Sequence, residues 1–362
     1  MKIGVLGSGQ LGRMLALSAY PLGHQMSFLA SSEEDPSSLL GNTFIQNGSQ
    51  EVIEEFAKNS DVVTYESENT AVSIVKEISQ KTMVYPSAKS LYTTQHRGRE
   101  KSLFDKLNIP CAPYQIVKNL SELKIAVENI GLPAILKTAT DGYDGKGQFL
   151  IQSDSQLDQA WKSMSGVESI LEGFVNFKRE LSLVAVRGVD NSHEYYPLVE
   201  NSHHNGILRL TIAPAQNISP KLQQQAESYM RSLLDEMNHV GVLTIELFET
   251  DNNLVVNEMA PRVHNSGHWT IEGARTSQFE NHIRAITETP LGDTSCTHEY
   301  SAMINIIGEQ GPIDKALTLK NAHLHLYNKT ERKGRKLGHI TITANTLDDL
   351  NSSLETLSDF MP

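Results

Sequence analysis

The sequence has 362 residues, more than one hydrophobic core usually organises, so we expect two or three packed domains. Its 43 acidic residues against 31 basic ones give a formal net charge of -12, which repels a nucleic-acid backbone. Two cysteines, Cys111 and Cys296, form no paired or metal-like spacing, and no apolar run approaches the length of a membrane span. We therefore expect a cytoplasmic protein with no nucleic-acid partner and no membrane partner.

The first 95 residues alternate short apolar runs with helical patterns. Strands are predicted at 3–6, 26–30, 61–65 and 83–86, and helices at 13–20 and 72–81. Such alternation is typical of a parallel sheet covered by helices. The pattern predicts a Rossmann-like domain over residues 1–95.

A smaller domain and a larger one are predicted to follow. A charged helical stretch at 94–107 and a helix at 121–129 precede strands at 134–138 and 148–151, which a glycine-rich connection joins. We interpret residues 96–171 as a lid domain. Later strands are predicted at 169–172, 181–186, 194–199, 241–248, 254–258 and 302–307, and helices at 221–238 and 278–287. Residues 172–362 are thus expected to form a mixed-sheet domain, and the fold class is α/β and α+β.

Two glutamates form the most informative pattern. Residues 242–248 and 254–258 are apolar strands on either side of a turn-rich stretch. If these strands pair symmetrically about Asn252, Glu246 lies opposite Glu258 and both side chains share one face. Opposed like charges destabilise a sheet unless a cation compensates, and Mg²⁺ held between carboxylates and nucleotide phosphates is the natural candidate. A slip in register would instead turn one of the glutamates toward solvent.

A glycine-rich stretch follows the strand predicted at 134–138. Gly142, Gly145 and Gly147 let backbone N–H groups approach an anion, and Lys146 adds positive charge. Lys137, at the end of the strand, would reach the same phosphate. The alternative interpretation is an ordinary hairpin turn beside a lysine at a strand edge.

Polar residues directly follow Glu258, and a basic run lies near the C-terminus. Arg262 suits a planar carboxylate or phosphate, and His264, Asn265 and His268 are candidates for acid, base or hydrogen-bonding roles. A polar loop without a reaction partner is the alternative. Residues 329–336 hold five basic side chains in eight positions, which suits a substrate phosphate, although such runs are usually solvated surface.

The stretch from Gly7 to Gly12 matches the dinucleotide-binding fingerprint, since it follows a predicted strand and opens a helix. An acidic run, 33–35, follows the second strand. An NAD site therefore stays open, although a helix N-terminus suits any anion.

Together these segments resemble the ATP-grasp superfamily, and within it the 5-(carboxyamino)imidazole ribonucleotide synthase family of purine biosynthesis. The resembling strings, in the family's order along nearly the whole chain, are Gly9-Gln10-Leu11-Gly12-Arg13-Met14, Gly142-Tyr143-Asp144-Gly145-Lys146-Gly147-Gln148, Pro261-Arg262-Val263-His264-Asn265-Ser266-Gly267-His268 and Arg335-Lys336-Leu337-Gly338-His339. The resemblance implies an ATP-grasp architecture in which an N-terminal parallel-sheet domain precedes the lid and the C-terminal domain. It also implies a homodimer.

The implied activity is that of an ATP-dependent carbon–nitrogen ligase. ATP would phosphorylate bicarbonate to carboxyphosphate, and the carboxyl unit would pass to the amine of 5-aminoimidazole ribonucleotide. ATP and Mg²⁺ would be the cofactors, and bicarbonate and the ribonucleotide the small-molecule substrates.

The resemblance further implies roles for individual residues. The residues that would bind ATP are Arg97, Lys137, Gly142, Tyr143, Asp144, Gly145, Lys146, Gly147, Gln148, Glu172, Gly173, Phe174, Val175, Glu180, His203, Asn257 and Glu258. Mg²⁺ would be held by Glu246 and Glu258. The residues that would hold the ribonucleotide are Gln10, Leu11, Glu68, Lys329 and Arg335. The catalytic residues would be Tyr143, Asp144, Lys146, Arg262, His264, Asn265 and His268.

Three positions depart from the family's pattern. Asp141 stands where the family commonly has another glycine. Ala260 stands where many ATP-grasp enzymes have an asparagine, so fewer side chains are expected to ligate the metal. The basic segment is about one residue shorter than in relatives, which leaves Arg335 and Lys336 as alternatives for the phosphate contact.

Three other functions compete with this interpretation. A formate-dependent glycinamide ribonucleotide transformylase shares the architecture, but the Gly-Tyr-Asp-Gly string at 142–145 disfavours it. An NAD-dependent oxidoreductase would use the N-terminal fingerprint, and a nucleotide sensor would bind ATP without turnover. Neither of these two explains the opposed glutamates.

Overall fold

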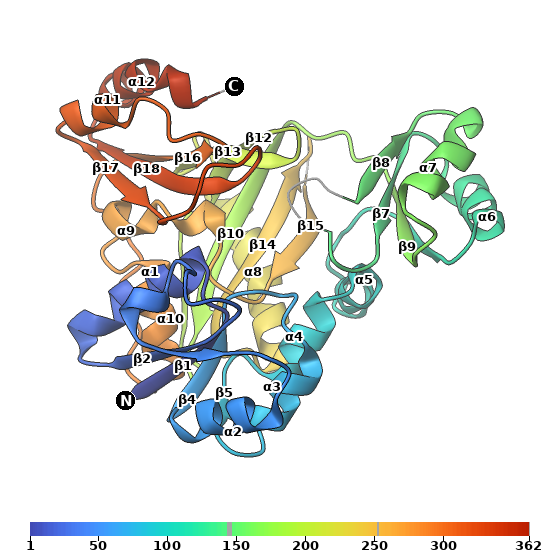
Figure 1. Cartoon of the computed structure of the whole chain (residues 1–362). Helices are drawn as coiled ribbons and strands as arrows, with labels where there is room; N and C mark the ends of the chain where they lie inside the picture. The colour runs from blue at the N-terminus through green and yellow to red at the C-terminus, as the bar shows by residue number, and fades with distance from the viewer. Residues whose placement is uncertain (143–146, 252, 362) are drawn as a thin grey trace.

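The N-terminal part of the chain is a parallel sheet with helices between its strands. The structure is a computed structural model that describes residues 1–142, 147–251 and 253–361 (Figure 1). Residues 1–95 are all described, and their five strands form a sheet in the order β3-β2-β1-β4-β5. Its strands are β1 (Lys2–Leu6), β2 (Gln25–Ala30), β3 (Asn42–Ile45), β4 (Val62–Tyr65) and β5 (Met83–Val84). Its helices are α1 (Gln10–Ala19), α2 (Gln50–Lys58) and α3 (Val72–Ile78). All pairings are parallel, which confirms the predicted sheet.

An antiparallel sheet in the order β6-β9-β7-β8 stands apart from the body, at the right of Figure 1. Its strands are β6 (Tyr114–Val117), β7 (Ala134–Thr138), β8 (Gln148–Ile151) and β9 (Ser169–Gly173). The helices α6 (Leu120–Ile130) and α7 (Leu157–Ser163) pack on it around their own apolar core. This sheet, with its two helices, corresponds to the small lid domain that was predicted from the strands at 134–138 and 148–151.

Two helices, α4 (Ala88–Thr94) and α5 (Arg97–Lys106), lead into the lid. The single helical stretch predicted at 94–107 is therefore wrong at its start. The chain breaks because the N–H of Arg97 donates to the carbonyl of Ala139 at 2.9 Å rather than to the preceding turn. The His96 ring then caps α5 by accepting from the N–H of Gly98 at 3.1 Å.

The largest sheet is antiparallel, in the order β15-β14-β10-β12-β13-β16-β18-β17, with β11 beside β10. Its strands are β10 (Arg179–Arg187), β11 (His193–Tyr195), β12 (Val199–His204), β13 (Ile207–Ala213), β14 (Gly241–Glu249), β15 (Leu254–Ala260), β16 (Tyr300–Ile307), β17 (Ala322–Leu326) and β18 (Lys336–Ala344). The helices beside it are α8 (Pro220–Met237), α9 (Thr270–Gly273), α10 (Gln278–Ile286), α11 (Ile313–Thr318) and α12 (Leu347–Thr356). The single strand predicted at 194–199 is wrong, because Pro197 lacks an N–H and separates β11 from β12.

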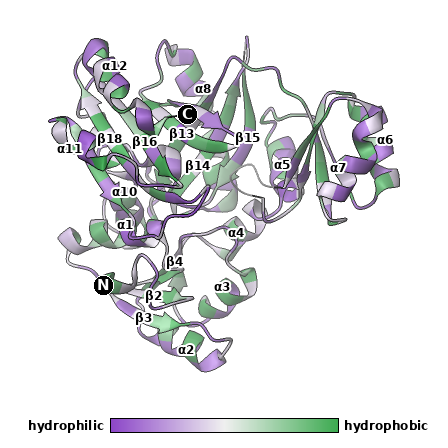
Figure 2. Ribbon diagram, turned by 45° about the horizontal axis from the view of Figure 1, so that its top comes forward, coloured by the Kyte–Doolittle hydropathy of each residue, from purple (hydrophilic) through white to green (hydrophobic). Residues whose placement is uncertain are grey.

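Hydrophobic residues gather along the strands of these sheets, whereas the outer turns of the helices are hydrophilic (Figure 2). α8 covers one face of the large sheet, and α10 covers the other face beside α1 of the N-terminal sheet. Among the described helices, none combines the length and apolar character needed to cross a membrane.

Two fully buried histidines connect the N-terminal sheet to the large one. His282 accepts from the N–H of Val242 at 3.1 Å through Nδ1, so its Nε2–H donates to the Thr64 hydroxyl of β4 at 2.8 Å. His239 bonds the carbonyl of Val242 at 3.0 Å and the Ser90 hydroxyl of α4 at 3.2 Å. Burial lowers the pKa of His239 to about 4 and that of His282 to about 3.

These histidines predict that the fold loses stability in mild acid. Because the folded chain keeps both rings neutral, the unfolded chain takes up protons first as the pH falls below about 6.5. We expect the free energy of unfolding to fall by up to about 1.4 kcal/mol per pH unit for each histidine between about pH 6 and pH 5. Urea unfolding across this range measures the slope.

A variant and a control make the assignment specific. His282→Gln keeps a donor toward Thr64 but does not titrate, so its stability should fall less steeply with pH than that of the wild type. His204→Gln, on an exposed histidine, should leave the slope unchanged. Equal slopes in His282→Gln and the wild type would contradict the prediction.

Candidate active site

The predicted pairing of Glu246 with Glu258 is confirmed. The two residues are register partners on β14 and β15, and both side chains are partly buried in a common pocket. Nearer the turn the register differs by one residue, since Leu247 pairs with Val256. Asn257 is therefore the extra residue of a β-bulge. Asn252, the assumed centre of symmetry, lies outside the described residues.

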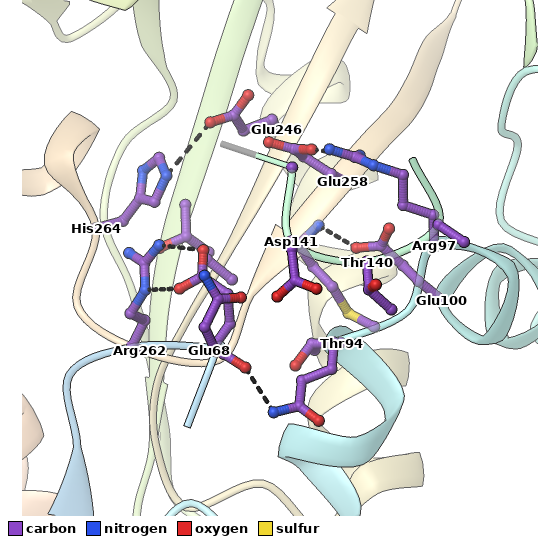
Figure 3. Close-up of a pocket in the computed structure, with 17 residues that line it drawn as sticks. Glu68, Thr94, Arg97, Glu100, Thr140, Asp141, Glu246, Glu258, Arg262 and His264 are labelled. Carbon is purple, nitrogen blue, oxygen red and sulfur yellow. Dashed lines mark hydrogen bonds and ion pairs between the residues drawn. The ribbon is translucent and has the colours of Figure 1, made fainter. Parts of the chain in front are cut away.

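A pocket open to solvent surrounds the two glutamates (Figure 3). It lies where the N-terminal sheet, α5, the lid strand β7 and the β14–β15 hairpin meet. The residues that line it are Glu68, Asn69, Thr94, Gln95, Arg97, Glu100, Ala139, Thr140, Asp141, Gly142, Thr244, Glu246, Glu258, Met259, Ala260, Arg262 and His264.

The charges of the glutamate pair are arranged to attract a cation. Burial and the neighbouring charge of Glu258 raise the pKa of Glu246. Burial acts in the same direction on Glu258, but the positive charges of Arg97 and Lys137 outweigh it and lower its pKa. Arg97 Nη1 lies 2.7 Å from Glu258 Oε2, and His264 Nε2 lies 3.3 Å from Glu246 Oε1.

This donor set fits a hard divalent ion. The register pairing of Glu246 with Glu258 offers two carboxylates at one place. Within the described residues no group of three or more His, Cys, Asp or Glu side chains forms a metal cluster. Mg²⁺ commonly takes one or two carboxylates and completes its shell with water and substrate phosphates. Glu246 and Glu258 match that mode of binding.

Arg262 and Glu68 lie side by side in the pocket lining and join the segment after β15 to the loop after β4 (Figure 3). The guanidinium donates through Nε at 2.5 Å and Nη2 at 2.7 Å to the two carboxylate oxygens. Although burial alone would raise the pKa of Glu68, the Arg262 charge lowers it to about 2. This two-pronged pairing is the geometry expected of arginine with a planar anion.

The polar residues after Arg262 share one loop but differ in exposure to the pocket. His264 lines the pocket, whereas His268 is buried and is not among the residues that line it. Asn265 forms a reciprocal amide pair with the fully buried Asn305, at 3.0 and 2.7 Å. The predicted grouping of these residues near Glu246 therefore holds for His264, while His268 does not line the pocket.

The predicted ATP residues Lys137 and Glu172 lie beside Asn257 of the β14–β15 hairpin. Lys137 Nζ lies 3.0 Å from Glu172 Oε2 and 3.4 Å from Asn257 Oδ1. Burial would raise the pKa of Glu172, but Lys137 and the buried Lys101 lower it to about 2. The other carboxylate oxygen, Glu172 Oε1, is buried with no hydrogen-bond partner in the described residues, so it is an acceptor ready for a ligand donor.

The other described residues predicted to bind ATP follow Glu172 in the chain or lie on β10 and β12. Gly173 ends β9, and the exposed Phe174 and the half-buried Val175 follow it. Glu180 Oε2 lies 3.0 Å from His203 Nδ1, so these two residues predicted to bind ATP are neighbours.

Several of the predicted lid residues fall outside the described residues: Tyr143, Asp144, Gly145 and Lys146. On their flanks, Gly142 lines the pocket, Gln148 opens β8, and the carbonyl of Gly147 accepts from the N–H of Thr138 at 2.8 Å. Asp141 has φ of 60°, in the left-handed region that glycine adopts without cost and aspartate tolerates. This conformation explains how aspartate replaces the family's glycine there.

The glycine fingerprint at the N-terminus is occupied by a carboxylate of the chain itself. Glu66 accepts from the N–H of Gly12 at 2.7 Å and from the N–H of Gly9. A Cβ on Gly7 would lie 2.6 Å from Glu66 atoms, so this glycine is needed to admit the side chain. The helix N-terminus that would hold a dinucleotide pyrophosphate is thus filled, which speaks against the NAD interpretation.

Of the predicted ribonucleotide residues, Gln10, Lys329 and Arg335 lie near one another, while Glu68 lines the pocket. Lys329 Nζ contacts Gln10 Oε1, which brings the basic run onto the start of α1, while Leu11 is buried in the core. Arg335 donates to the hydroxyl of Thr330 at 2.8 Å. Within the basic run 329–336, the positive charge of Lys336 acts on the pKa of both Glu246 and His264.

Several pocket residues were missed by the sequence interpretation. Thr244 was detectable, since it lies two residues before Glu246 on the same strand face. Glu100 had no local signal, because its contact is to the N–H of Met259 at 2.5 Å across the fold. Burial raises the pKa of Glu100 to about 8.

Known family models match the chain in three successive parts. An ATP-grasp domain matches residues 102–279, a ribonucleotide synthetase preATP-grasp domain matches 1–95, and a phosphoribosylaminoimidazole carboxylase C-terminal domain matches 301–353. The N5-carboxyaminoimidazole ribonucleotide synthase of Pseudomonas aeruginosa is 46% identical over 94% of this chain and 94% of its own. That of Bacillus subtilis is 40% identical over 96% of this chain and 92% of its own. The chain belongs to the N5-carboxyaminoimidazole ribonucleotide synthase family.

Solved structures of this synthase family agree with the fold. The enzyme from Thermus thermophilus superposes with a TM-score of 0.94 at 46% identity, covering 98% of this chain and 97% of its own. The Aspergillus clavatus synthase, in complex with ADP and 5-aminoimidazole ribonucleotide, has a TM-score of 0.92 at 33% identity, covering 99% of this chain and 98% of its own. The predicted ATP-grasp architecture and the family resemblance are both confirmed.

Proposed function

We propose that the chain carboxylates 5-aminoimidazole ribonucleotide with bicarbonate and ATP, giving 5-(carboxyamino)imidazole ribonucleotide, ADP and phosphate in purine (IMP) biosynthesis. The observation that carries this proposal is the Glu246/Glu258 pair facing the Arg262 fork within one pocket. That arrangement suits a magnesium-bound triphosphate beside a small planar anion. It is supported by relatives of that name that align over nearly the whole chain.

The reaction proceeds in two transfers. A bicarbonate oxygen attacks the γ-phosphorus of ATP, ADP leaves, and carboxyphosphate forms. The ribonucleotide amine then bonds to the carboxyl carbon, phosphate leaves, and the amine gives up a proton. When bound, Mg²⁺ neutralises charge on the phosphate oxygens.

The chain's own residues bind and orient the substrates. Arg97, Lys137 and the lid hold the phosphates, and Glu172 Oε1 accepts from the adenine amine at the hinge that runs to Val175. Glu180 and His203 hold the ATP ribose. Asn257 assists the glutamates at the metal.

The second half-site handles the carboxyl group and the ribonucleotide. Arg262 stabilises charge on bicarbonate and carboxyphosphate, with His264, Asn265 and His268 near it. Tyr143 and Asp144 would meet the aminoimidazole, Asp144 would accept its proton, and Lys146 would bind the phosphates. The residues that hold the ribonucleotide's ribose and phosphate are Gln10, Leu11, Glu68, Lys329 and Arg335 or Lys336.

Omitting each substrate in turn tests the proposal. ADP release should require bicarbonate and rise on addition of 5-aminoimidazole ribonucleotide. Formate in place of bicarbonate should not support turnover, whereas a formate-dependent transformylase would use it. ADP formation that never responds to the ribonucleotide would overturn the substrate assignment.

The proposed place of action is the cytoplasm, and the proposed assembly is a homodimer. The division into residues 1–95, 96–171 and 172–362 stays a prediction. Sedimentation of the purified chain measures the assembly.

Lys329 predicts a pH dependence of ribonucleotide binding. Burial and the charge of Arg335 lower the pKa of Lys329 to about 8. Above that pH the ligand-free protein loses the ammonium group that attracts the substrate phosphate. We expect the KM for 5-aminoimidazole ribonucleotide to rise severalfold between about pH 7.5 and pH 9, at saturating ATP.

Lys329→Arg provides the control, because an arginine stays charged throughout this range. Its KM should vary less with pH than that of the wild type. A KM that rises equally in both proteins would assign the pH dependence to another group.

A further inference from the structure

Gln278 holds the main chain of the loop that carries the reactive residues. It is the first residue of α10, and its side chain is fully buried. Its Oε1 accepts from the N–H of His264 at 2.9 Å, and its Nε2 donates to the carbonyl of His264 at 2.7 Å. One side-chain amide thus bonds both main-chain polar groups of His264, as a neighbouring strand would. β15 has already ended at Ala260, so the sheet no longer fixes the chain at this point.

The loop is folded tightly around this amide. A Cβ on Gly267 would lie 2.6 Å from Gln278 Cδ and Oε1, so only glycine lets the loop close over it. The N–H of Gln278 donates to the Thr270 hydroxyl at 3.0 Å, and that hydroxyl donates to the carbonyl of Gly267 at 2.6 Å. Gln278 is therefore surrounded by the loop from 264 to 270.

A second hydrogen of the same amide faces His268. Gln278 Nε2 lies 3.3 Å from His268 Nδ1. An amide nitrogen can only donate, so Nδ1 must accept and the ring proton must reside on Nε2. The ring is buried, and burial lowers the pKa of His268 well below its usual value, so it is neutral.

We infer that Gln278 is a positioning residue for carboxyl transfer, which holds His264 against Glu246 and keeps His268 in its Nε2–H tautomer. The inference rests on the proposed function, since it uses the roles assigned there to the loop. Through the backbone it holds, Gln278 directs the His264 ring toward Glu246 at 3.3 Å. Its hydrogen bonds within the described part of the chain go to the loop and do not reach the ATP residues Lys137 or Glu172.

The chain offers a matched control three residues along the same helix. Asn281 is also fully buried, and it accepts from the N–H of Gly292 at 2.7 Å and donates to the carbonyl of Gly292 at 3.2 Å. This is the same side-chain clamp on a loop residue, but Gly292 does not line the pocket. Asn281→Asp therefore reports the structural cost of weakening such a clamp away from the site.

Kinetics of Gln278→Glu and Gln278→Met test the inference. Glutamate keeps one acceptor but places a carboxylate oxygen against the His264 carbonyl, and methionine removes both bonds at similar volume. We expect kcat to fall about 10- to 100-fold and the KM for bicarbonate to rise, while the KM for ATP stays unchanged, as for partners that orient reactive groups. Asn281→Asp should lower the thermal midpoint without changing kcat or the KM for bicarbonate. Full activity in a folded Gln278→Met, or an equal kinetic loss in Asn281→Asp, would overturn the inference.

The ring nitrogens of His268 give a readout that does not depend on activity. In the ¹⁵N-histidine-labelled wild-type protein, the His268 shifts should report protonation at Nε2, and Gln278→Met should shift the ring toward the other tautomer. A wild-type ring protonated at Nδ1 would overturn the inference even if the variants fail to fold. Absence of ribonucleotide-dependent turnover in the wild type would instead overturn the proposed function.

Discussion

Glu258→Gln should reduce turnover at least about 100-fold while the chain keeps its fold, because it removes one of the two opposed carboxylates proposed to hold Mg²⁺. The amide is isosteric, so the β14–β15 pairing should persist. With one negative charge fewer, the concentration of Mg²⁺ needed for half-maximal ADP release should rise. Steady-state ADP release at several Mg²⁺ concentrations, with thermal unfolding alongside, measures both effects.

Glu249→Gln is the matched control for that prediction. Glu249 lies on the same hairpin and bonds Arg179 at 2.5 Å, as Glu258 bonds Arg97, but it does not line the pocket. Its loss should leave turnover and the Mg²⁺ requirement unchanged. If Glu258→Gln behaved like Glu249→Gln, Glu258 would not be a metal ligand.

The pairing of Glu246 with Glu258 was predicted correctly, but the symmetry about Asn252 from which it was predicted does not hold along the whole hairpin. A symmetric hairpin about Asn252 would also pair Leu247 with Asn257, whereas the structure pairs Leu247 with Val256. The turn alone would have offset the glutamates by one residue, and the bulge at Asn257 restores their opposition. The bulge is held from α5, since Lys101 Nζ donates to the carbonyl of Asn257 at 2.8 Å. No local pattern reveals a contact between residues so far apart in sequence.

Segments whose chemistry is local were predictable. The alternation of apolar runs with helical patterns predicted β1, β2, β4 and β5 and their parallel sheet, but it missed the edge strand β3. The polar loop after Glu258 lies beside the glutamate pair because it follows directly in the chain. By contrast, β18 was interpreted through the basic run before it, and its alternation over 336–344 was overlooked. Gln278 and Asn305 escaped notice because each looks like an ordinary polar residue at the start of a helix or within a strand. Their partners in the site loop are not their neighbours in sequence, and only the tertiary fold brings them into contact.

The roles of the glycines at the N-terminus could not be decided from sequence for a related reason. The fingerprint from Gly7 to Gly12 requires close approach of an acceptor to the backbone, and the sequence does not say which acceptor. The structure supplies Glu66, at the end of the neighbouring strand β4. An internal carboxylate and a bound pyrophosphate satisfy the same helix N-terminus, so the motif alone does not distinguish them.

Arg262→Lys should lower kcat by about 10²- to 10³-fold, the loss typical of removing one donor that stabilises developing negative charge. A lysine retains the charge but not the planar fork that spans both oxygens of Glu68 at 2.5 and 2.7 Å. Bicarbonate-dependent ADP release without the ribonucleotide should fall as well, because the fork acts on carboxyphosphate before carboxyl transfer. The KM for ATP should stay unchanged, since the hydrogen bonds of Arg262 within the described residues go to Glu68 and Val263, whereas those of Lys137 go to Glu172 and Asn257.

The matched control for this substitution lies on the outer side of α10. Arg284 donates to Glu280 through Nε at 2.9 Å and Nη2 at 2.5 Å, outside the pocket, so Arg284→Lys should keep full activity. Arg262 also lowers the pKa of Glu68 to about 2, so weakening the fork should raise that pKa. Carboxyl-selective NMR can follow the pKa without substrate. A variant with a raised Glu68 pKa and undiminished kcat would show that the fork orders the pocket but takes no part in the reaction. A loss of kcat together with the raised pKa would place the guanidinium where negative charge develops.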